Sequence, residues 1–118
     1  MRTIADAAVA LVAVLHAYFL VLEMFLWTRP FGLRTFGLAP EFARATRALA
    51  ANQGLYNGFI AAGLAWGLAL GGAGHAIVVF FLCCVVVAGV FGGFTASRKI
   101  LWVQAAPGAV ALALVLFA

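Results

Sequence analysis

His16 and Glu23 are ionisable residues within the first long apolar stretch of the chain, seven positions apart. Seven helical steps turn a helix by about 700°, so both side chains point to the same side, roughly 10 Å apart along the axis. Water or a third group would have to bridge them. Such a pair could act as acid and base, or as successive stations for a proton. Because an ionisable residue within a membrane span is costly, it is by default a sign of function.

A structural role is also open to each of these two residues. Glu23 lies four residues before Trp27, about one helical turn from the expected membrane interface, where its carboxylate could reach water or a basic loop residue. His16 lies deeper, where a hydrogen-bonded histidine is often part of the packing. A metal site is disfavoured, because these two strong ligands lie too far apart to share an ion. We expect no metal and no cofactor.

A polar run from Asn52 to Gly58 opens the second long apolar stretch. On a helix its amide and phenol side chains fall within an arc of about 140°. Lipid cannot satisfy these groups, so we expect them to face inward at the depth of Glu23 and to bond to one another or to a guest. Thr95, Ser97 and Gln104 lie at the same end of the third and fourth stretches. The candidate proton- or substrate-binding residues are Glu23, His16, Asn52, Gln53, Tyr56, Asn57 and Gln104.

The composition requires lipid as the main solvent. Of the 118 residues, 68% are hydrophobic and only 8% are charged, with a mean hydropathy of +1.21, whereas soluble proteins carry about 25% charged residues. A membrane span needs roughly 20 mostly apolar residues, so the length allows four. We predict an all-α membrane protein, a four-transmembrane-helix bundle in a single domain of residues 1–118. Its spans cover about residues 5–27, 51–70, 75–94 and 100–118.

The first loop, residues 28–50, is basic: it carries four arginines against one acid, Glu41. Pro40 and Glu41 suit the first turn of a helix, and Phe42, Ala45 and Leu49 follow at helical spacing. We therefore expect a short amphipathic helix along the membrane surface. This loop and the link 95–99 hold six of the seven Lys and Arg residues. The positive-inside rule then predicts that both are cytoplasmic and that both termini lie outside.

Glycines four residues apart recur along the second and third spans: Gly54 with Gly58, Gly63 with Gly67, and Gly89 with Gly93. This spacing lets helix backbones approach closely, within the chain or between subunits. The adjacent Cys83 and Cys84 point about 100° apart on a helix and are interpreted as apolar packing residues. Without a dense basic stripe, nucleic acid is not an expected partner.

Several of these segments together resemble one family. The stretch His16-Ala17-Tyr18, with Leu22-Glu23-Met24-Phe25 and Trp27, resembles the first-helix signature of the domain-of-unknown-function 1304 family. The run Asn52-Gln53-Gly54-Leu55-Tyr56-Asn57-Gly58-Phe59 is similar to the most distinctive segment of that family. Later similarities are Ala88-Gly89 with Gly92 and Thr95, and Gln104 with Pro107. The resemblance implies a bacterial four-helix inner-membrane protein and supplies no activity.

Three functions are compatible with these residues. The first is binding or transport of a small solute or proton around Glu23, in an architecture similar to the small multidrug-resistance exporters; so short a chain would need to oligomerise to enclose a path. The second is an accessory or assembly subunit of a larger membrane complex. The third is an intramembrane enzyme acting on a lipid or isoprenoid, with Glu23 and His16 as acid and base. We favour the first, and catalysis least.

Overall fold

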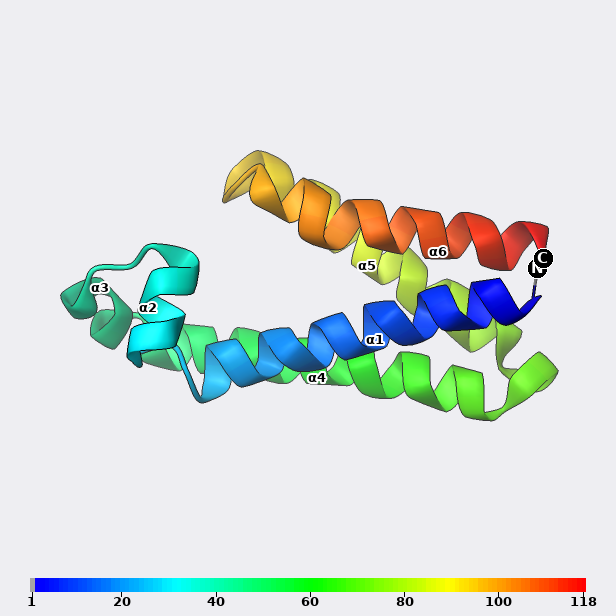
Figure 1. The fold of residues 1–118 in the computed structure, drawn as a ribbon, viewed down its shortest axis with the longest axis horizontal. Helices are drawn as coiled ribbons and strands as arrows, with labels where there is room; N and C mark the ends of the chain where they lie inside the picture. The colour runs from blue at the N-terminus through cyan, green and yellow to red at the C-terminus, as the bar shows by residue number, and fades with distance from the viewer. Residues whose placement is uncertain (1) are drawn as a thin grey trace. The chain divides into compact units, whose positions relative to one another are not determined.

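The computed structural model describes residues 2–118 and is built from helices, with no strand in that range (Figure 1). The three longest helices are α1 (Arg2–Met24), α4 (Arg47–Ala69) and α5 (His75–Thr95). The shorter ones are α2 (Pro30–Phe36), α3 (Pro40–Ala45) and α6 (Ala106–Phe117). A 3-10 turn, Gly71–Gly74, precedes α5, and a π turn, Leu101–Ala105, precedes α6. The all-helical prediction is confirmed.

The chain divides into two compact units. The loop unit is Val14–Ala61, which holds α2, α3, the end of α1 and the start of α4. The terminal unit joins residues 2–13 to Ala62–Ala118, and so holds the start of α1, the end of α4, α5 and α6.

Within residues 2–118, two segments are long and apolar enough to cross a membrane: Arg2–Met24, with a mean hydropathy of 2.1, and Gly71–Thr95, with 2.8. α4 is as long as α1, at 23 residues, but its first half carries the polar run. The segment Leu101–Phe117 is apolar and shorter.

The first loop differs from its prediction, because it contains two short helices where one was expected. Pro30 stands in the first turn of α2, and Gly37 ends it in the left-handed conformation at φ 64°, with its N–H donated to the Leu33 carbonyl. Proline at the start and glycine at the end are ordinary helix signals. Arg29-Pro30 was interpreted only as the end of the preceding helix, which hid the start of the next one. The expected 42–45–49 stripe is divided between α3 and α4.

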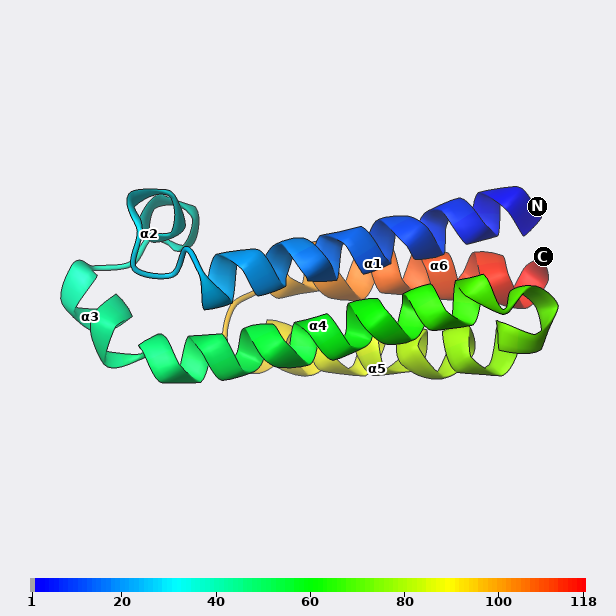
Figure 2. The same cartoon turned by 90° about the horizontal axis from the view of Figure 1, so that it is seen from below.

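Within the terminal unit, α6 packs along α5 (Figure 2). A Cβ on Gly89 would lie 2.5 Å from the backbone N of Ala105, and one on Gly108 would lie 2.6 Å from Val85 Cγ1. Gly93 lies against the Leu101 side chain in the same way. These glycines allow the two backbones to approach each other more closely than any larger residue would permit.

Pro107 is the second residue of α6, two positions after the π turn ends at Ala105. The Ala106 N–H donates to the Leu101 carbonyl, five residues back, instead of to the usual carbonyl four residues back. A proline inside a helix lacks an N–H and crowds the carbonyl of the preceding turn. The widened turn gives that crowding room, and α6 continues beyond it.

Candidate functional site

Glu23 and Asn57 form a polar contact between α1 and α4 inside the loop unit. The Asn57 Nδ2 group donates a hydrogen bond to Glu23 Oε1 over 2.5 Å. Asn57 is only 7% exposed, and Glu23 is partly buried. Two residues 34 positions apart in the sequence, both predicted as site residues, are thus brought together.

Glycines on α4 make this contact possible. A Cβ on Gly54 would lie 2.7 Å from Met24 Cγ and 3.1 Å from Glu23 Cβ. One on Gly58, a turn further along, would lie 2.6 Å from Leu20 Cδ1. Because both positions lack a side chain, α4 lies close enough to α1 for the short asparagine side chain to reach the carboxylate. The close approach predicted for Gly54 and Gly58 is therefore made within one chain.

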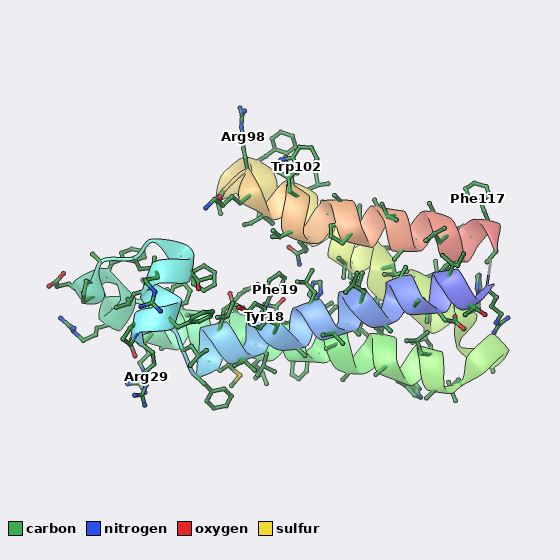
Figure 3. The ribbon with its side chains drawn as sticks, viewed as in Figure 1. Tyr18, Phe19, Arg29, Arg98, Trp102 and Phe117 are labelled. Carbon is green, nitrogen blue, oxygen red and sulfur yellow. The ribbon has the colours of Figure 1, made fainter. Side chains whose placement is uncertain are left out.

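His16 is fully buried, with 0% of its surface exposed. Its ring packs edge-on against Phe19, with ring centroids 5.4 Å apart and planes inclined by 69°. Figure 3 shows Phe19 and its neighbour Tyr18 in the C-terminal half of α1. This environment suits the structural interpretation of His16, and seven residues of helix still separate it from Glu23.

The rest of the polar run differs from its prediction. Asn52, Gln53 and Tyr56 are exposed in this chain instead of facing inward. The face that α4 turns toward α1 is set by its smallest residues, Gly54 and Gly58, and only Asn57 lies at the edge of that face. Helical steps of about 100° carry the other three polar side chains away from it. Within this chain, only Asn57 of the predicted arc is buried.

The polar residues at the end of α5 are satisfied locally. Thr95 Oγ1 donates to the Phe91 carbonyl over 2.7 Å, and Ser97 Oγ accepts the Lys99 N–H over 3.3 Å. Gln104 is half-buried in the π turn of the terminal unit. Thr95 and Ser97 therefore serve their own backbone. Among residues 2–118, no three His, Cys, Asp or Glu side chains are grouped closely enough to hold a metal ion.

A cleft of about 290 Å³ in the terminal unit was missed by the sequence analysis. Its ionisable lining residues are Arg2, Asp6 and His75, and the remaining walls include Gly67, Gly71 and Val115. None of the candidate proton- or substrate-binding residues lines it, although Gly67 is one of the predicted helix-packing residues. Only the fold brings the start of α1 beside the glycine turn, so no motif in the sequence indicated this cleft.

The family described as "Protein of unknown function (DUF1304)" matches residues 10–116. The chain belongs to that family. The Glu23–Asn57 contact, Gly54 and Gly58, the π turn and almost all of the terminal unit fall within the matched residues.

One curated protein is similar to this chain over most of its length. The "Uncharacterized protein YpaA" of Lactococcus lactis subsp. lactis (strain IL1403) is 31% identical over 96 residues, which cover 80% of this chain and 81% of that protein. No solved structure matches the chain. A bacterial origin is consistent with this relative.

Proposed function

We propose that this protein is a four-span inner-membrane protein that binds a proton or a small cation at Glu23 and couples it to the movement of a small solute. The observation that carries the proposal is the hydrogen bond from Asn57 to Glu23 at 2.5 Å. It presents an intramembrane carboxyl whose partner is a neutral amide.

The chemistry of the Glu23–Asn57 pair supports reversible binding of a proton or a cation. A buried carboxylate needs a compensating charge, or else a proton, to be tolerated in an apolar surrounding. Asn57 supplies one hydrogen-bond donor and no charge, while a carboxylate has about four lone-pair sites. A proton or a cation can therefore occupy the remaining sites and leave again. An arginine in place of Asn57 would fill the site permanently.

The membrane arrangement belongs to the proposal. α1 and Gly71–Thr95 have the length and hydropathy of spans, and we propose that α4 and the helix formed by the π turn with α6 complete four crossings. The basic segments 28–50 and 95–99 would then face the cytoplasm. Because one short chain encloses little volume, we expect copies of it to associate, or to join a larger complex, around the transport path.

The test uses the full chain reconstituted in liposomes with an imposed pH gradient. Uptake of tetraphenylphosphonium, a lipophilic cation, and dissipation of the gradient are followed together. We expect Glu23→Gln to abolish the coupled movement. The matched control is Glu41→Gln, the same chemical change on a side chain that is 82% exposed on α3, and we expect it to retain the movement.

If the Glu23→Gln protein takes up the cation and dissipates the pH gradient as the wild type does, the proposed coupling role of Glu23 is overturned. If wild-type liposomes instead show no movement, and the protein is recovered from native membranes with a stoichiometric partner, the accessory-subunit function takes its place.

A further inference from the structure

The segment from Arg29 to Arg47, here called the basic loop, concentrates positive charge on exposed side chains. Its four arginines are all exposed: Arg29, Arg34, Arg44 and Arg47. The one acid, Glu41, lies 4.0 Å from Arg44, with both side chains largely in solvent, and an exposed pair of this kind binds weakly. Arg29 projects outward beside α2 (Figure 3). The loop therefore presents a positive surface.

Aromatic side chains are interleaved with these charges. Phe31 is 46% exposed, Phe36 39% and Phe42 55%. On α2, helical spacing puts Phe31 and Arg34 on the same side, about 60° apart, with buried Gly32 on the far side. This combination suits a bilayer interface, where rings enter the acyl boundary and guanidinium groups stay among the headgroups.

The basic loop is held in place by several contacts. Gly32 lies against the Leu26 carbonyl, so close that no side chain would fit between them. The Trp27 ring packs against Phe36, with centroids 5.0 Å apart. Trp27 Nε1 also donates to Thr46 Oγ1 over 3.1 Å. These contacts hold the backbone of the basic loop in place. Less conformational entropy is therefore lost when the arginines of the loop bind a ligand.

We propose that the basic loop is a binding surface for anionic phospholipid headgroups of the bilayer in which the protein resides. The loop connects the end of α1 to the start of α4, so it stands at the membrane surface wherever those helices cross. A guanidinium group can donate two parallel hydrogen bonds to two oxygens of one phosphate group. The exposed phenylalanines favour a lipid over a soluble anion, because their rings can bury apolar surface only against the acyl chains of a lipid.

The experiment titrates the full chain, purified in a non-ionic detergent, with short-chain phosphatidylglycerol or phosphatidylcholine, and counts bound lipids by native mass spectrometry. We expect wild type to bind phosphatidylglycerol at least tenfold more tightly. Arg34→Gln with Arg47→Gln should remove most or all of that preference at low salt, since each arginine near an anionic surface contributes about fivefold. Arg34→Lys with Arg47→Lys keeps the charge and should retain most of the preference.

The matched control is Arg98→Gln with Lys99→Gln, which also removes two positive charges, but from the link between α5 and the π turn. An equal loss in this control would overturn the proposal, since total charge would then explain the preference. Equal binding of the two lipids by wild type would also overturn it. Displacement of phosphatidylglycerol by millimolar inorganic phosphate would assign the arginines to a soluble anion instead.

The wild-type protein alone provides a second test. Raising the salt from about 0.05 M to about 0.5 M shortens the screening length several-fold. The preference for phosphatidylglycerol should then fall steeply, and a preference that does not change with salt would contradict the proposal.

Discussion

Trp27 and Thr46, 19 residues apart, are joined by a side-chain hydrogen bond that closes the basic loop at its base. The Thr46 hydroxyl accepts the indole N–H and in turn donates to the Phe42 carbonyl over 2.8 Å. One threonine thus connects the turn after α1 with the junction of α3 and α4. α1 ends at Met24, and Trp27 lies in the turn that follows it.

Replacing Thr46 with valine should destabilise the protein. The substitution keeps the shape of the side chain and removes the hydroxyl, leaving the partly buried indole N–H without its acceptor, at a cost of about 1–2 kcal/mol. The measurement is the free energy of unfolding in mixed detergent micelles. Thr35→Val is the control, because the Thr35 hydroxyl donates only to Phe31 in its own helix. If both variants lose the same stability, the loop closure contributes nothing specific.

Gly54→Ala should separate α1 from α4. The new Cβ would meet Met24 Cγ at 2.7 Å and the Leu20 carbonyl oxygen at 3.2 Å, and the backbone oxygen cannot move aside as a side chain can. Overpacking of this kind costs about 1–3 kcal/mol. Gly72→Ala serves as the comparison, since its Cβ would meet only the Arg2 guanidinium, at 3.8 Å, and should change stability by less than about 0.5 kcal/mol. A neutral Gly54→Ala would show that the two helices do not need this close approach.

Glu23 and Asn57 should be energetically coupled. A double-mutant cycle with Glu23→Ala and Asn57→Ala should give an interaction energy of about 0.5–2 kcal/mol, the range expected for a hydrogen bond between helices in a membrane. The control cycle pairs Glu23→Ala with Thr35→Ala and should be additive. Additivity in the first cycle would mean that the 2.5 Å contact carries no net stabilisation.

The two ends of α5 should be reached from opposite sides of the membrane. A helix of 21 residues is about 31 Å long, close to the thickness of the hydrocarbon core of a bilayer. With Cys83 and Cys84 replaced by alanine, we expect a membrane-impermeant maleimide to label Gly72→Cys on intact cells, and Ser97→Cys only on inverted vesicles. Labelling of both from the same side would contradict a crossing by α5 and the orientation expected from the basic residues.

The sequence predicted the helical fold well and singled out Glu23 as a candidate, because both depend on local signals. Apolar runs of sufficient length are helices in this chain, and an acid among apolar residues stands out. Asn57 was also found, but among three neighbours that the structure leaves exposed. Asn57 differs from Asn52 and Tyr56 because it lies beside the glycine face of α4, which packs against α1. This placement is a property of packing between two helices and is not contained in the polar pattern alone.

The sequence patterns did not predict the start of α2 or the cleft in the terminal unit. Arg29-Pro30 can end one helix and begin another, and both occur within six residues of Met24. The cleft beside Arg2, Asp6 and His75 depends on the return of the chain through the glycine turn. Both cases concern how the segments meet, where hydrophobic periodicity gives no guidance.

The paired glycines have a consequence for self-association. Gly54, Gly58, Gly63, Gly67, Gly89 and Gly93 each lie against a residue of the same chain. These glycines are therefore already engaged within the chain, and the exposed side chains of α5 include large rings such as Phe80, Phe91 and Phe94. Helices that meet through large side chains stay further apart, where lipid chains compete for the same contacts. A contact between two copies through these rings would therefore hold their helices further apart than the glycine contacts hold the helices within one chain.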